Sequence, residues 1–269
     1  MQGSLGEKLG EGHFAEVHAW APGQVVKLFK AWVPERLSWW EARMTRAVFA
    51  AGGPAPQVLG EITLEGRFGM ILPRLDGPTL LDLSRSAAMP SEQVGAILAA
   101  VAMTVHQAPP PAHAPSLRDS VGGSLRDTSG VVPDHIATGV LALIDRLTPG
   151  DGLCQGDLNS GNVIMTAEGP RLIDWLGAVR APAAYDLACC HVIFFETAPE
   201  IAPDPERPIA VGAAMQAEYA RLAGVTLAAL TAEVERYLPI ARLSAVFAGA
   251  VPTLRERLIQ RIEAALGSD

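Results

Sequence analysis

The chain has 269 residues, of which 49% are hydrophobic. That is enough apolar material for a sizeable core in one two-lobed unit or in two small domains. Its formal net charge of −8 excludes the usual nucleic-acid binder, which carries a basic face or stripe.

The N-terminal quarter predicts a small antiparallel sheet with one helix. Residues 5–30 alternate apolar and polar side chains around an Ala-Pro-Gly turn, which is typical of a hairpin. Residues 35–51 have apolar side chains at helical spacing and stop at a Gly-Gly-Pro sequence. Two further short strands follow, in PQVLGEIT and RFGMILPRL. We therefore expect a β-rich lobe over residues 1–75.

After the Asp-Gly-Pro sequence at 76–78, the pattern becomes mostly helical. Helices are predicted at residues 79–86, 91–106, 135–147, 209–222, 226–247 and 252–266. Residues 107–130, rich in Pro, Gly and Ser, predict a surface loop, and residues 196–208 also interrupt the helical pattern. The expected class is α+β, with a larger helical lobe over residues 76–269.

Cysteine content and hydropathy indicate a reduced, cytoplasmic protein. The three cysteines, Cys154, Cys189 and Cys190, have neither the number of a disulfide framework nor the spacing of a metal site. The N-terminus lacks the pattern of a signal peptide. The longest uncharged apolar run, which begins at Val94, is too short to span a bilayer, so we expect no membrane partner.

A glycine-containing turn in the first hairpin is the first functional signal. Gly10, Gly12 and Ala15 form a G-x-G-x-x-A-x-V pattern, and Lys27 follows on the next predicted strand. Glycines let a phosphate approach the backbone, and a lysine supplies a point charge for it. A dinucleotide-binding turn would need a helix next, whereas this pattern predicts strands. An ordinary tight turn is the alternative.

A second signal is the stretch CQGDLNSGNVI, residues 154–164. It places Asp157 and Asn162 in a turn punctuated by glycines, and Asp174 follows in the sequence IDW. A hydrophobic core has no need for such a set of polar side chains, so the turn predicts a site for a charged ligand. The alternative is an Asx-turn loop in which these side chains cap backbone groups.

Together, these motifs resemble the aminoglycoside phosphotransferase and choline kinase branch of the protein-kinase-like fold. The resemblance runs from about Gly6 to Ala188 and is strongest over residues 154–188, where the family has H-G-D-x-x-x-x-N followed by I-D-[WF] and Y-D-L-A. It implies a two-lobed fold, ATP and Mg²⁺ as cofactors, and phosphoryl transfer to a hydroxyl group of a small molecule.

The resemblance also implies a role for each polar residue. Asp157 would orient the acceptor hydroxyl and accept its proton, while Asn162 and Asp174 would ligate Mg²⁺. Lys27 would contact the nucleotide phosphates. Glu41 would form an ion pair with Lys27, and Glu35 is the rival for that place.

By the same resemblance, residues Leu72 to Leu75 would bind adenine through main-chain groups between the lobes. Pro73 has no N–H, so the donor would come from a neighbour such as Arg74 or Leu75. Gln155 departs from the family pattern, which usually has histidine there. Since glutamine can also donate and accept hydrogen bonds, we expect an active enzyme.

Other residues bear on support and on the acceptor. Asp186 is expected to be buried and to accept hydrogen bonds from the backbone of the 154–164 stretch, while His106 and His191 are expected to be core or capping residues. A cationic acceptor, such as an aminoglycoside or an amino alcohol, would suit the acidic residues, although a solvated acidic loop explains them equally well; they are Asp186, Glu196, Glu200, Asp204 and Glu206.

Two other functions stay open from the sequence. One is a metabolic sugar, amino-sugar or amino-alcohol kinase on the same fold, because the motifs determine the reaction and not the substrate. The other is a nucleotide-binding pseudokinase. The sequence carries no signal for an oligomeric state.

Overall fold

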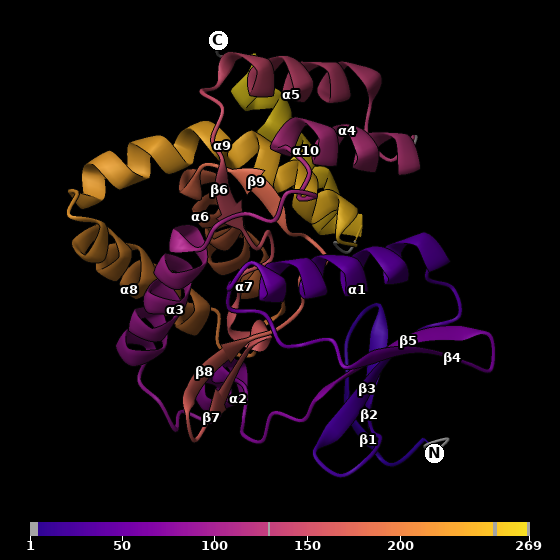
Figure 1. Ribbon diagram of the computed structural model, residues 1–269. Helices are drawn as coiled ribbons and strands as arrows, with labels where there is room; N and C mark the ends of the chain where they lie inside the picture. The colour runs from indigo at the N-terminus through magenta and orange to yellow at the C-terminus, as the bar shows by residue number, and fades with distance from the viewer. Residues whose placement is uncertain (1–4, 129, 250–251, 268–269) are drawn as a thin grey trace.

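The computed structural model describes residues 5–128, 130–249 and 252–267, so the outermost ends of the two predicted lobes, 1–4 and 268–269, lie outside the described residues. It consists of a small sheet lobe and a larger helical lobe (Figure 1). The sheet lobe contains β1 (Lys8–Glu11), β2 (Ala15–Ala19), β3 (Gln24–Phe29), α1 (Glu35–Ala50), β4 (Gly60–Leu64) and β5 (Arg67–Pro73). These elements match the predicted order.

The five strands form one antiparallel sheet in the order β1-β2-β3-β5-β4. β3 lies in the middle, and Lys27 on it pairs with Val17 on one side and Met70 on the other. A position inside a sheet fixes the backbone on both sides. Lys27 therefore leaves the sheet from a rigid point.

Helix α1 connects the cores of the two lobes. Its Ala42 packs in the sheet-lobe core with Phe29 and Met70, whereas its Met44 and Val48 belong to the core of the helical lobe. Apolar residues at helical spacing give the helix this buried face. It stops at Ala50, next to Gly52, whose φ of +82° is a conformation that favours glycine.

The helical lobe contains a bundle of helices and two two-stranded sheets. Its elements are α2 (Leu80–Arg85), α3 (Ser91–Gln107), α4 (Leu117–Asp127), α5 (Asp134–Arg146), β6 (Gly152–Cys154), the 3₁₀ turn η1 (Ser160–Asn162), β7 (Val163–Thr166), β8 (Gly169–Leu172), β9 (Val179–Ala181), α6 (Ala183–His191), the π-helix η2 (Val192–Thr197), α7 (Ala198–Ile201), α8 (Glu206–Ala223), α9 (Leu227–Phe247) and α10 (Pro252–Leu266). The predicted division at residue 75 falls between β5 and α2, and it stays a prediction.

The predicted loop at residues 107–130 is wrong in part, because α4 occupies its second half. Two glycines in LRDSVGGSLRD lower its helix propensity, but the hydroxyl of Ser116 accepts from the Asp119 N–H and caps the helix. Leu117 and Val121 are buried in the helical-lobe core. Tertiary packing therefore outweighs the weak local signal.

The interruption predicted at residues 196–208 is also shorter than expected. Helix α6 continues directly into η2 and α7, and α8 already begins at Glu206. The run that forms α6 and η2 is apolar on several faces, because it lies inside the lobe, so it lacks the one-sided periodicity of a surface helix. Among the described residues, no helix combines the length and apolar character needed to cross a membrane.

Helices α3 and α8 pack closely at Gly95. A Cβ atom there would lie 2.6 Å from the Cβ of Ala214 and 2.7 Å from the backbone N of Met215. The backbones can approach this closely only because Gly95 has no side chain. The contact fixes how α8 lies against α3.

We expect Gly95→Ala to lower the free energy of unfolding by about 1–3 kcal/mol, because overpacking outweighs the better helix propensity of alanine. Urea unfolding measures the change. Gly122→Ala in α4 is the matched control, since its added Cβ would meet nothing closer than Arg126 Nη1 at 3.5 Å. The control should be neutral or stabilising by up to about 1 kcal/mol. Equal losses from both changes would contradict this account of the packing.

Candidate active site

Three predicted site residues meet where the two lobes join. The Lys27 Nζ lies 2.5 Å from the Glu41 Oε1 and 3.2 Å from the Asp174 Oδ2. Lys27 comes from β3, Glu41 from α1, and Asp174 from the segment after β8, so the contact spans both lobes. Burial lowers the pKa of Lys27, but the charges and hydrogen bonds of the two carboxylates hold it above its ordinary value. Lys27 is therefore cationic here.

The structure decides between the two glutamates named for this contact. The side chain of Glu41 is 1% exposed and faces Lys27. Glu35 is exposed at the start of α1 and accepts a hydrogen bond from Trp39 Nε1 at 3.0 Å. Glu41 is thus the partner of Lys27.

The loop at residues 155–162 brings Asp157 and Asn162 together. Asn162 Nδ2 donates to the Asp157 carbonyl at 2.9 Å and to its Oδ2 at 3.0 Å. Asn159 Nδ2 donates to the same carbonyl at 2.8 Å and to Oδ1 at 3.2 Å. Two amides therefore orient one carboxylate, which stays exposed on its open side.

The surroundings of Asp157 raise its pKa above the ordinary value. The protein packed around it is the largest cause, and the negative charge of Asp174 adds to it. The amides of Asn162 and Asn159 act in the opposite direction, because they stabilise the carboxylate. Such a shift makes Asp157 a better proton acceptor once it is ionised.

Gln155 fastens this loop to the Asp174 segment, a role that the sequence did not assign. It is fully buried, and its Nε2 donates to the carbonyls of Asp174 and Ile173. Its Oε1 accepts from the Asp157 N–H at 2.8 Å. Asp174 has a φ of +62°, a conformation uncommon for residues other than glycine. The side chain of Gln155 therefore holds Asp174 through the backbone carbonyl of Asp174.

Asp186 supports the loop through hydrogen bonds to its backbone, as expected. Its buried carboxylate accepts from the Gln155 N–H at 3.0 Å and from the Gly156 N–H at 2.7 Å. Gly156 has a φ of +83°, and a Cβ there would lie only 2.3 Å from the Gly177 carbonyl oxygen. Only glycine fits this position, so the loop adopts one path over Asp186.

The glycine turn lies between β1 and β2, where its backbone is open. The Gly12 N–H donates to the Ala15 carbonyl at 2.8 Å. A Cβ at Gly10 would meet nothing within 4 Å. Ala15 itself is buried in the sheet-lobe core, so its small side chain serves packing. Because the Gly12 N–H is already used, the remaining backbone N–H groups of the turn, and not the side chain of Ala15, would be the groups available to a phosphate.

The segment between the lobes shows which backbone N–H group is free for the hydrogen bond expected with adenine. The Arg74 N–H already donates to the Gly23 carbonyl at 2.9 Å. No described hydrogen bond uses the Leu75 N–H. Leu72 packs against the sheet-lobe core. Of the two donors that the sequence left open, Leu75 is the available one.

Three of the five acidic residues expected near the acceptor, Glu196, Glu200 and Asp204, carry arginine partners, whereas Asp186 contacts His106. Arg242 Nη2 and Arg261 Nη1 lie 2.8 and 2.7 Å from the carboxylate of Glu196. The other ion pairs of this region join Glu200 to Arg257 and Asp204 to Arg207. These three carboxylates are therefore paired with arginines and do not form a free anionic pocket.

Comparison with known proteins relates this chain to phosphotransferases. The profile described as the phosphotransferase enzyme family matches residues 16–225. No curated protein matches the chain by sequence.

Solved structures resemble the whole fold at low identity. An aminoglycoside phosphotransferase in a ternary complex with AMP-PNP and hygromycin B matches with a TM-score of 0.62 and 17% identity over 99% of this chain and 94% of that one. The ethanolamine kinase of Plasmodium vivax gives 0.64 and 12% over 97% and 81%. The putative fructosamine-3-kinase of Haemophilus somnus gives 0.62 and 14% over 97% and 91%. These proteins share its two-lobed, kinase-like fold.

We expect Gln155→Leu to destabilise the protein by about 1–3 kcal/mol or more, because it leaves the Asp157 N–H and the Asp174 carbonyl without their partner. Chemical denaturation measures the loss. Gln57→Leu, at an exposed position, is the control and should stay within about 0.5 kcal/mol of the parent. If Gln155→Leu proves as harmless as its control, the side chain does not hold the loop.

Proposed function

The chain belongs to the phosphotransferase enzyme family, and on that premise we propose that it transfers the γ-phosphate of ATP, with Mg²⁺, to a hydroxyl group of a small molecule. The observation that carries the proposal is the contact of Lys27 with both Glu41 and Asp174, beside the pair of Asp157 and Asn162. Phosphoryl transfer depends on positioned charges more than on covalent chemistry. The site provides such charges from both lobes.

In this proposal, Lys27 contacts the phosphates of the nucleotide. Glu41 keeps the ammonium group in place from α1, since a buried carboxylate needs a partner. The turn that follows Gly10 and contains Gly12 covers the phosphates with its remaining backbone N–H groups, since the Gly12 N–H already bonds to the Ala15 carbonyl. Leu75 provides the N–H for adenine.

The oxygen ligands fit magnesium. Asp174 offers a carboxylate and Asn162 an amide oxygen, since its Nδ2 already donates to Asp157. Magnesium prefers few protein oxygens and takes its other ligands from phosphates and water. When bound, it would neutralise negative charge on the phosphates. Lys27 and Gln155 would keep Asp174 directed toward it.

Asp157 is the proposed general base. It would accept a hydrogen bond from the acceptor hydroxyl, orient its oxygen toward the γ-phosphorus, and take its proton. The amides of Asn159 and Asn162 fix the carboxylate for that task. All the polar groups that transfer requires are present, which favours an active enzyme over a pseudokinase.

The acceptor is less narrowly defined. An aminoglycoside stays a possible acceptor, and one structural neighbour binds hygromycin B. The arginine partners of Glu196, Glu200 and Asp204 nevertheless reduce the attraction for a polycation. They favour the second candidate, a metabolic kinase for a sugar, an amino sugar or an amino alcohol. The buried free thiols fit a reducing compartment, so we place the protein in the cytoplasm.

A coupled assay for ADP, run with Mg²⁺ and a panel of acceptors, tests the proposed function. Aminoglycosides, sugars, amino sugars and amino alcohols form the panel.

We expect Asp174→Asn to lower turnover more than about a hundredfold, because it removes the charged ligand while asparagine tolerates the positive φ. Asp145→Asn, at an exposed ion pair with Arg118, is the control. Near-normal turnover of Asp174→Asn would refute its assignment to the metal.

We expect Asp157→Asn to lower the transfer rate by about 10²–10⁴ while nucleotide affinity changes little, because only the proton-accepting charge is lost. Single-turnover kinetics and titration calorimetry with a non-hydrolysable ATP analogue separate the two quantities. A variant with weak nucleotide binding and normal chemistry would make Asp157 a binding residue.

A further inference from the structure

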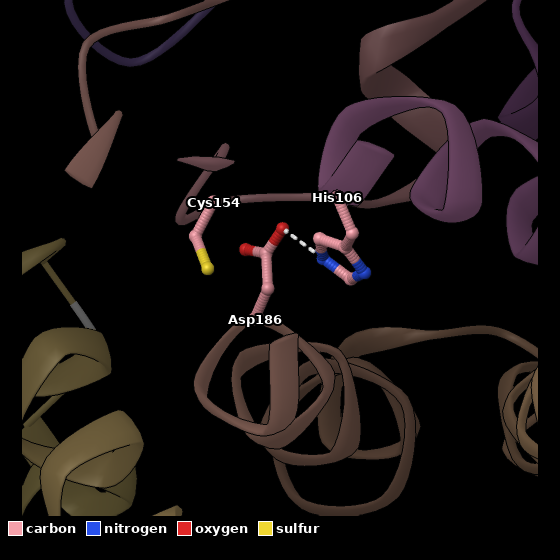
Figure 2. A group of neighbouring side chains, drawn as sticks. All are labelled: His106, Cys154 and Asp186. Carbon is pink, nitrogen blue, oxygen red and sulfur yellow. Dashed lines mark hydrogen bonds and ion pairs between the residues drawn. The ribbon is translucent and has the colours of Figure 1, made fainter. Parts of the chain in front are cut away.

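A chain of buried hydrogen bonds runs from α8 to the 155–162 loop. The Tyr219 hydroxyl lies 2.7 Å from His106 Nδ1, and His106 Nε2 lies 3.2 Å from Asp186 Oδ2. Asp186 in turn accepts from the N–H groups of Gln155 and Gly156. Figure 2 shows the imidazole of His106, which comes from the last turn of α3, directed at the carboxylate.

The chemistry of the three groups gives each hydrogen bond a direction. Both oxygens of Asp186 accept from backbone N–H groups, so we assign the carboxylate as the acceptor and His106 Nε2 as the donor that faces it. We assign the tautomer with the proton on Nε2, in which Nδ1 accepts and the Tyr219 hydroxyl donates. Tyr219 thereby selects the tautomer in which His106 can serve Asp186.

The same neighbourhood could be taken for a metal site, since His106, Cys154 and Asp186 offer three ligand atoms within 4.8 Å of one another. The Cys154 thiol, however, faces the carbonyls of Ala181 and Pro182 at 3.5 Å. Both oxygens of Asp186 already accept hydrogen bonds. A network of satisfied hydrogen bonds explains the group better than an ion does.

We propose that Tyr219 is a positioning residue for phosphoryl transfer, which acts through His106 and Asp186 on the loop that carries Asp157. The inference rests on the function proposed above. Its structural basis is that Tyr219 belongs to α8, whose position against α3 is fixed at Gly95. The loop therefore takes its position from the interior of the helical lobe as well as from the neighbouring strands.

Tyr219→Phe tests the proposal, because it removes the donor and keeps the ring. We expect kcat to fall about tenfold, the effect of one lost buried hydrogen bond. The Kd for a non-hydrolysable ATP analogue should stay within about twofold, since Tyr219 touches no nucleotide-binding group. The amide protons of Gln155 and Gly156 should exchange with solvent about tenfold faster, and hydrogen exchange followed by NMR measures this.

Changes at His106 show whether Tyr219 acts through it. His106→Gln keeps a donor near Asp186 and should retain most of kcat, whereas His106→Leu should lose at least as much as Tyr219→Phe. In the His106→Leu background, Tyr219→Phe should cost nothing further. An equal loss in both backgrounds would overturn the proposal. If His106→Leu does not fold, unchanged amide exchange in Tyr219→Phe would overturn it as well.

Tyr185→Phe is the matched control, since its hydroxyl lies 3.1 Å from Ser244 Oγ and no described hydrogen bond joins it to His106. It should leave kcat and the two amides unchanged, and a loss equal to that of Tyr219→Phe would refute a specific role. The exchange measurement also separates the two proposals. If the parent protein transfers no phosphate to any acceptor, the proposed function fails, while faster exchange in Tyr219→Phe would still support the link from Tyr219 to the loop.

Discussion

Two carboxylates share one ammonium group where the lobes meet, and much of the arrangement depends on this contact. A buried Glu41 would be costly without Lys27, so the pair fixes α1 against the sheet. Because Met44 and Val48 of the same helix pack in the other core, the sheet is tied to the helical lobe. Asp174 completes the contact from that lobe, so each lobe supplies one carboxylate to the same ammonium group.

The proximity of Asp157 and Asn162 could be predicted from the sequence, because both residues belong to one short loop. Asp157 and Asn162 are five residues apart, so a single tight turn brings them together. The role of Gln155 could not be predicted, because it depends on the backbone of Asp174, which lies nineteen residues away. Equally, the partner of the Arg74 N–H is set by the pairing of β3 with β5 and not by local sequence.

The elements that sequence reasoning missed have two causes. Helix α4 has a weak local signal, and its order comes from burial of Leu117 and from contacts with other elements. One of these is the ion pair of Asp127 with Arg36 on α1, at 2.7 Å. In α6 and η2 the apolar side chains are buried on several faces, so no period stands out. Hydrophobic periodicity identifies helices with one solvent-exposed face, and it fails for α6 and η2 because they are enclosed by protein.

An amide at position 155 has a consequence for the conditions in which the loop keeps its shape. Imidazole exchanges a proton with water in the range of pH 5 to 8, and its hydrogen bonds change when it does. The side chain of Gln155 does not titrate, so its bonds to Asp174 and Asp157 are the same throughout that range. At acidic pH, the hydrogen bonds of the Gln155 side chain would persist, whereas a histidine at this position would become protonated and would have to rearrange its hydrogen bonds.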